Sequence, residues 1–231
     1  MPTRYWLVIP AAGIGQRMRA NRPKQYLRIH DRYLLDITMS RLLDAFHFDG
    51  CVLALDPGDG WWRETESAND HRIILCDGGA QRRDSVAMAL QTLVPYAASD
   101  DWVLVHDVAR PCLHPDDLHG LITTLADHPV GGLLACPVSD TLKRAGADNQ
   151  VLETLDRRGV WRALTPQMFR FGILRQALAQ AAEQDFPVTD EASAIESAGK
   201  APRLVEGRSD NIKVTLPADL QLAEFILSRS D

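Results

Sequence analysis

Short apolar runs alternate along the chain with segments whose apolar residues recur at helical spacing. The short runs predict strands at residues 5–9, 51–55, 73–76, 102–105, 132–138, 163–169, 202–206 and 211–214. Apolar positions three or four apart predict helices at 33–46, from about 83, from 114, at 172–184, from 189 and from 217. This alternation indicates an α/β fold.

Residues 139–160 break this pattern. They are polar, with isolated apolar residues at Leu142, Val151 and Leu155 and a turn at 146–150. A β-hairpin arm explains the composition, and the alternative is a solvent-exposed loop. A loop of more than about fifteen residues without structure is uncommon inside a compact domain, so the hairpin is favoured. With no repeat or linker in the sequence, we expect one domain over residues 1–231, with 137–159 as its arm.

Composition narrows the classes of ligand. The 231 residues are 45% hydrophobic and 24% charged, which is typical of a globular protein that can bury a core. The net charge of −6 gives no global field that would attract a nucleic acid polymer or an anionic membrane. An anionic ligand would therefore need a local cluster of cations.

The cysteines and the apolar runs indicate the cellular compartment of the protein. The four cysteines form no CxxC pair and sit in or beside apolar runs, which favours buried free thiols over a metal site. No apolar run approaches the roughly eighteen residues of a membrane span, and no basic segment followed by a long apolar stretch opens the chain. We expect a protein of the reducing cytoplasm.

A turn of small residues follows the first predicted strand. Pro10 ends the strand, and four residues with almost no side chain come next: Ala11, Ala12, Gly13 and Gly15. Backbone N–H groups in such a turn can converge on an anion. Glycine turns after strands are common, so these residues alone favour an ordinary turn. Pro23 fixes the backbone before Lys24, which makes this lysine a better candidate for a phosphate ligand than a mobile surface charge.

Two further residues stand at positions where ligands bind in α/β proteins. Ser85 lies in the first turn of a predicted helix, where its hydroxyl could meet a ligand or cap the helix. Asp107 follows the strand at 102–105, and ligands of open sheets lie outside the carboxyl ends of strands. Asp107 is therefore a metal candidate, with a cap or turn residue as the equal alternative.

Nine segments together resemble one family, the 2-C-methyl-D-erythritol 4-phosphate cytidylyltransferases of the non-mevalonate isoprenoid route. In chain order they are PAAGIGQRM, RPKQYL, DGG, RRDSV, VLVHDVARP, PVSDTLKR, LDRRGVWRALTPQMF, VTDEASAIE and VEGRSDNIKVT. Each segment is weak alone, whereas the ordered set, which reaches residue 215, is highly specific.

The resemblance implies a Rossmann-like three-layer α/β/α nucleotidyltransferase domain with a protruding β-arm. It also implies a reaction in which the phosphate of methylerythritol phosphate attacks the α-phosphorus of CTP in line and releases diphosphate. The implied cofactor is Mg²⁺ or another divalent cation. Family members are homodimers with interlocked arms, so Thr141 and Arg157 would serve the partner's active site.

The resemblance also implies roles for individual residues. The catalytic residues would be Arg17, Lys24, Arg157 and Lys213. The CTP-binding residues would be Ala11, Ala12, Gly13, Gly15, Gly79, Ser85 and Asp107, with Asp107 also near the metal. The acceptor would be held by Arg110, Thr141, Arg157, Thr165, Thr189 and Lys213.

The sequence departs from the family pattern in the turn after the first predicted strand, in the turn at residues 80–81 and beside Asp107. Gln16 stands where many members have a second basic residue, which predicts weaker triphosphate binding. Ala80 and Gln81 occupy a turn that is often acidic, and Val108 replaces a common alanine. None of these changes removes a residue with an implied chemical role.

Other functions remain as alternatives. A related cytidylyltransferase for another polyol phosphate, such as ribitol 5-phosphate, would share the fold. A dinucleotide-binding oxidoreductase would need GxGxxG, and Met18 stands at the last glycine position. A non-catalytic nucleotide-binding module would have lost its cations, which this chain retains.

Overall fold

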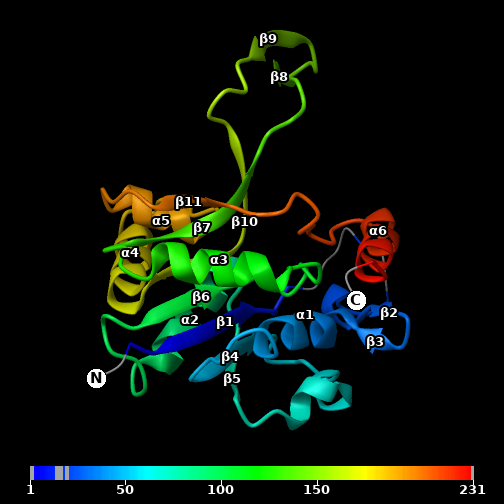
Figure 1. The fold of residues 1–231 in the computed structure, drawn as a ribbon, viewed down its shortest axis with the longest axis vertical. Coiled ribbons are helices and arrows are strands. Elements are labelled where there is room, and N and C mark those ends of the chain that lie inside the picture. The colour runs from blue at the N-terminus through cyan, green and yellow to red at the C-terminus, as the bar shows by residue number, and fades with distance from the viewer. Residues whose placement is uncertain (1–2, 14–17, 19–20, 230–231) are drawn as a thin grey trace.

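A mixed sheet of seven strands forms the centre of the computed structural model, which describes residues 3–13, 18 and 21–229 (Figure 1). The strand order is β11-β7-β10-β6-β1-β4-β5, and β10 runs antiparallel to both of its neighbours. The strands are β1 (Tyr5–Pro10), β4 (Gly50–Leu55), β5 (Ile73–Asp77), β6 (Trp102–Val105), β7 (Gly131–Pro137), β10 (Trp161–Arg170) and β11 (Arg203–Glu206).

Helices cover both faces of this sheet. They are α1 (Leu34–Leu43), α2 (Arg82–Leu93), α3 (Pro115–Leu125), α4 (Phe171–Glu183), α5 (Glu191–Ser197) and α6 (Pro217–Leu227). The apolar sides of α1 and α3 pack in one core cluster, and those of α2, α4 and α5 pack in another. The fold is therefore the three-layer α/β/α arrangement that the alternating pattern and the family resemblance predicted.

The central strands are buried on both sides, which explains why their sequences read as continuous apolar runs. In β1, Leu7 and Ile9 belong to the core beneath α1 and α3. Trp6 and Val8, which alternate with them, belong to the core beneath α2 and α4. Burial of both faces holds the strands in register, so the loops at their carboxyl ends have fixed positions.

The predicted strand at 211–214 is wrong. These residues form neither strand nor helix, and they lie beside the loop after β6 instead of joining the sheet. The Val214 backbone N–H donates to the Ala109 carbonyl, and the Arg110 side chain donates to the Asn211 carbonyl. Apolar residues at 212 and 214 made the segment resemble a strand, but the irregular loop gives their backbone only isolated partners.

Other boundaries moved, and some elements were missed. The first helix ends at Leu43 instead of residue 46. A small hairpin, β2 (Arg28–Ile29) with β3 (Arg32–Tyr33), precedes α1, and 3-10 helices occur at η2 (Lys24–Tyr26), η3 (Trp62–Glu64) and η4 (Glu66–Asn69). Such short pieces have too few residues for a periodic pattern.

A hairpin projects from the body between β7 and β10 (Figure 1). Its strands, β8 (Leu142–Ala145) and β9 (Val151–Leu155), pair only with each other in antiparallel fashion. Val151 and Leu152 are 62% and 66% exposed. The polar composition of 139–160 thus reflects an arm with almost no core of its own.

Within the described ranges, no helix is long and apolar enough to cross a membrane. The four cysteines are free thiols; Cys51, Cys112 and Cys136 are buried, and Cys76 is half-buried. Burial raises the pKa of the Cys51 and Cys112 thiols, Cys112 to about 12.

Gly131 allows β7 to pass close to β10. Its φ of +124° lies in a region that side chains rarely adopt, and a Cβ there would lie 2.1 Å from the Met168 carbonyl oxygen. Gly120, in the exposed middle of α3, has nothing within 4 Å of an added Cβ. The two glycines therefore differ in what an added methyl group would meet.

We expect Gly131→Ala and Gly120→Ala to change stability in opposite directions. Gly131→Ala should lower the free energy of unfolding by roughly 2 to 4 kcal/mol through strain and overlap. Gly120→Ala should raise it by about 0.5 to 1 kcal/mol, because alanine loses less backbone entropy in a helix. Urea denaturation of both variants checks this; a Gly131→Ala protein as stable as the wild type would contradict the close approach.

Candidate active site

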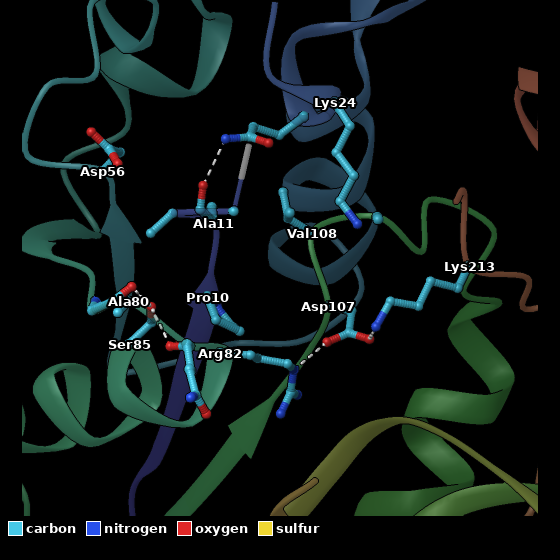
Figure 2. Close-up of a pocket in the computed structure, with 16 residues that line it drawn as sticks. Pro10, Ala11, Lys24, Asp56, Ala80, Arg82, Ser85, Asp107, Val108 and Lys213 are labelled. Carbon is cyan, nitrogen blue, oxygen red and sulfur yellow. Dashed lines mark hydrogen bonds and ion pairs between the residues drawn. The ribbon is translucent and has the colours of Figure 1, made fainter. Parts of the chain in front are cut away.

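A cavity of about 650 Å³ opens at the carboxyl ends of β1, β5 and β6 (Figure 2). These strands are parallel to one another through β4, so the loops that follow them meet at one edge of the sheet. The lining residues include Ala11, Ala12, Gly13, Lys24, Gly79, Ser85, Asp107 and Lys213. The structure therefore brings together eight of the residues that sequence comparison placed in the site.

Two small-residue loops form one wall of this cavity. A Cβ on Gly78 would lie 2.4 Å from the Ala12 Cβ, so only glycine lets the loop after β5 pack against the loop after β1. The Gly79 N–H donates to the Ser85 hydroxyl over 3.1 Å, and this hydroxyl donates to the Gln81 carbonyl over 3.2 Å. Ser85 thus holds the loop from inside, besides lining the cavity.

Gln25 connects the segment that carries Lys24 to the first loop. Its side chain is 1% exposed, and its amide donates to the Ala11 carbonyl over 2.7 Å. Lys24 and Gln25 belong to η2, directly after Pro23. Pro23 and this buried hydrogen bond together position Lys24 at the cavity, as Figure 2 shows.

Asp107 lies between cations that approach from opposite sides (Figure 2). Arg82 Nε donates to Asp107 Oδ1 over 2.7 Å, and Lys213 Nζ lies 2.7 Å from Asp107 Oδ2. Arg110 Nε is 3.7 Å from the same Oδ2. Arg82 also donates two hydrogen bonds to Glu191, at 2.7 and 3.0 Å. We call Arg82, Asp107, Arg110, Glu191 and Lys213 the charge cluster.

Burial strengthens these ion pairs. Burial alone would raise the pKa of Asp107, but the charges of Arg82 and Lys213 hold it far below its usual range. Burial alone would lower the pKa of Arg82, but Glu191 and Asp107 raise it above its usual value. Both groups therefore stay charged at every physiological pH.

A buried histidine fixes the backbone at Asp107. His106 Nε2 lies 3.0 Å from the Arg110 carbonyl, which can only accept, so Nε2 carries the proton. His106 Nδ1 then accepts from the Thr165 hydroxyl over 3.0 Å, and that hydroxyl accepts from the Asp107 N–H over 3.1 Å. Burial lowers the pKa of His106 to about 4, so the ring is neutral.

Of the six expected acceptor residues, only Lys213 lines the cavity. Thr165 is buried beneath Asp107. Thr189 is exposed, at the start of the segment leading into α5. Thr141 and Arg157 are exposed on the arm, and Arg157 donates to the Ser139 carbonyl across it. None of these four residues lines the cavity.

The described residues leave out Gly15, Gln16 and Arg17, so the expected effects of these three residues stay predictions. The other departures from the family pattern, Ala80, Gln81 and Val108, line the cavity. Ala80 has no polar side-chain group, so any hydrogen bond to a ligand there must involve its backbone.

The donor set fits a metal that is bound mostly by a substrate. Among the described residues, no three His, Cys, Asp or Glu side chains are grouped as a metal site. Asp56 and Asp107 are the carboxylates among the described lining residues. Asp107 follows β6, and its two oxygens face Arg82 and Lys213. Mg²⁺ is often bound by one or two carboxylates with substrate phosphates, and a single carboxylate fits that mode.

Sequence reasoning missed Arg82 and Glu191. Both lie inside segments that match the family, but no role was predicted for Arg82, and Glu191 was included only in the helix predicted from residue 189. In the structure the cap is Asp190, which accepts from the Ser193 N–H over 2.9 Å. The sequence contained a signal for Glu191. Asp190 can cap the helix by itself, so the carboxylate that follows it is available for another partner.

The geometry defines the class of protein. A Rossmann-like sheet edge carries two small-residue loops, Lys24 and a charge cluster, and this combination suits phosphoanhydride chemistry on a nucleotide. The class is therefore a nucleotidyltransferase.

The comparisons with known proteins identify the family. The family model of 2-C-methyl-D-erythritol 4-phosphate cytidylyltransferase matches residues 5–229, so the chain belongs to this family. Relatives with this name include one from Pseudomonas entomophila, 56% identical over 94% of this chain and 93% of its own length. One from Hahella chejuensis is 49% identical over 98% of this chain and 94% of its own length.

A solved structure agrees in fold. The Francisella tularensis 2-C-methyl-D-erythritol 4-phosphate cytidylyltransferase superposes with a TM-score of 0.85 at 36% sequence identity, covering 97% of this chain and 100% of that one. The chain is thus an enzyme and a cytidylyltransferase, and the oxidoreductase and non-catalytic alternatives are not favoured.

Proposed function

We propose that the described cavity carries out the family's reaction, CTP-dependent transfer of a cytidylyl group to 2-C-methyl-D-erythritol 4-phosphate. The acceptor phosphate attacks the α-phosphorus of CTP in line, and diphosphate leaves. The observation that carries this proposal is the convergence of Lys24, Lys213 and Asp107 on the cavity that the two small-residue loops line.

The small-residue loops receive the nucleotide. Ala11, Ala12, Gly13 and Gly79 present backbone groups to the cytosine and ribose, and Ser85 keeps the second loop in place. Lys24 takes the triphosphate, and Arg17 and Gly15 are predicted to contribute to the same task. Positioned backbone groups read the base, which is how cytosine is distinguished from uracil.

The opposite side of the cavity receives the acceptor. Lys213 holds its phosphate, and Arg110 adds positive charge from beside Asp107. Thr165 supports Asp107 from beneath, and Thr189 is a further predicted acceptor residue outside the lined cavity. Two anions that meet in one cavity repel each other, and the cations on both sides offset that repulsion. The chain forms no covalent intermediate; it orients two phosphates and stabilises the charge that develops around the α-phosphate.

Asp107 is the residue that would hold the Mg²⁺ ion. A divalent cation that is shared between Asp107 and the triphosphate would neutralise phosphate charge. The expected preference is Mg²⁺, with other divalent ions as possible replacements.

The arm supplies residues to a second copy of the chain. Thr141 and Arg157 are exposed on the arm and outside the chain's own cavity, and the arm has exposed apolar residues such as Leu152. A homodimer in which each arm reaches the partner's cavity uses both features. The enzyme acts in the cytoplasm, on small-molecule substrates.

Diphosphate release from CTP should require methylerythritol phosphate and Mg²⁺, and should be slow with ribitol 5-phosphate. The reason is that the acceptor side is matched to one polyol phosphate, while the metal offsets triphosphate charge. A coupled diphosphate assay with each acceptor, with and without chelator, checks this. Preference for ribitol phosphate would overturn the acceptor assignment, and CTP binding without turnover would indicate a binding module.

Lys24→Ala and Lys213→Ala should each lower kcat by ~10²-fold or more, the scale for the loss of one preorganised charge-stabilising donor. Lys200→Ala, on an exposed turn, is the matched control and should be unchanged. Steady-state turnover measures all three. Turnover near the wild-type value in either cavity variant would remove that lysine from the mechanism.

Arg157→Ala and Lys213→Ala subunits should recover partial activity when mixed and allowed to exchange. Each mutant homodimer lacks one residue at every site, whereas a heterodimer assembles one intact site from two chains. Activity of isolated, verified heterodimers measures this. If they are as inactive as the two homodimers, the arm does not supply Arg157 to the partner.

A further inference from the structure

Four members of the charge cluster form a row of alternating sign that runs from the interior to the cavity. In the order of the row, the exposed fraction of the side chain is 1% for Glu191, 27% for Arg82, 8% for Asp107 and 38% for Lys213. The ion pairs that connect them span 2.7 Å each. Glu191 does not line the cavity, but it is coupled to Lys213 through Arg82 and Asp107.

Glu191 is fixed independently of the cavity. It begins α5, where the Ala192 N–H donates to Gln167 Oε1 over 2.9 Å. Gln167 Nε2 donates to Asp190 Oδ2 over 2.8 Å, and Gln167 itself is 1% exposed. The carboxylate of Glu191 therefore has a fixed place, from which it holds Arg82 through two hydrogen bonds.

We propose that Glu191, acting through Arg82, sets how strongly Lys213 and Arg110 attract an anion in the cavity. Glu191 and Arg82 are positioning residues, and the inference rests on the proposed function of this cavity. The two inner groups, Arg82 and Asp107, each divide their attraction between two neighbours, so a change at the buried end reaches the exposed end.

The effects at the two positions have opposite signs. Three cations and two carboxylates give the charge cluster a net charge of +1. Without the charge of Glu191, Arg82 pairs more fully with Asp107, which releases Lys213, and the net charge becomes +2. Without the charge of Arg82, Asp107 pairs more fully with Lys213 and Arg110, and the net charge becomes 0.

The test is the affinity for inorganic diphosphate, measured by titration calorimetry at low salt with chelator present. Glu191→Gln should bind diphosphate more tightly and Arg82→Gln more weakly, each on the order of tenfold. The double variant Arg82→Gln/Glu191→Gln restores the net charge and should return towards the wild-type affinity. All differences should shrink at high salt.

The turnover rate distinguishes the orienting of Asp107 from the attraction of an anion to the cavity. We expect kcat to fall in both single variants, because Arg82 either moves from its place or is lost and the orientation of Asp107 changes, even though binding changes in opposite directions. Arg82→Lys keeps the charge but not the forked hydrogen bonds, so it should keep diphosphate affinity within about threefold and lose turnover.

Arg83→Gln and Glu196→Gln are the matched controls. Arg83 follows Arg82 on α2 but donates to the Phe186 carbonyl, and Glu196 is exposed on α5. Both should leave affinity and turnover unchanged.

Weaker diphosphate binding by both single variants would show a merely structural role and overturn the proposal. If Arg82→Gln fails to fold, the sign for Glu191→Gln decides alone: tighter binding supports the proposal, and unchanged or weaker binding overturns it. Diphosphate needs no acceptor, so this result is separable from a failure of the acceptor assignment.

Discussion

The site depends on one carboxylate that is placed between opposing cations. Asp107 is buried at the end of β6, and its charge is maintained because Arg82 contacts one oxygen and Lys213 the other. A buried carboxylate without such partners would be very costly, and the three cations around it would repel one another without it. The same arrangement places the positive charges of Arg82 and Lys213 at the cavity, where two phosphates have to meet.

The fold brings these groups together from distant parts of the sequence. Arg82 begins α2, Asp107 follows β6, Glu191 begins α5, and Lys213 lies on a loop. The parallel strands direct the first two loops to one edge of the sheet. The loop with Lys213 reaches the same edge because its backbone is hydrogen-bonded to the segment after Asp107.

The sequence was sufficient to predict the layers, the arm and half of the residues that line the cavity. Continuous apolar runs such as 102–105 could only be buried strands or short helix segments. The turn residues that bound these runs favoured strands. The pattern failed at 211–214, because hydrogen bonds to Ala109 and Arg110, distant in sequence, decide that segment's conformation. Glu191 was missed for a similar reason: its partner is 109 residues away, and no local spacing reveals it.

The most direct test of this account is the turnover of Asp107→Asn, which keeps the size of the side chain and removes its charge. Single-turnover diphosphate release should fall by ~10²-fold or more in protein that still unfolds cooperatively, because the cations lose their common partner. Release within about threefold of the wild-type rate, in folded protein, would contradict the central role of Asp107.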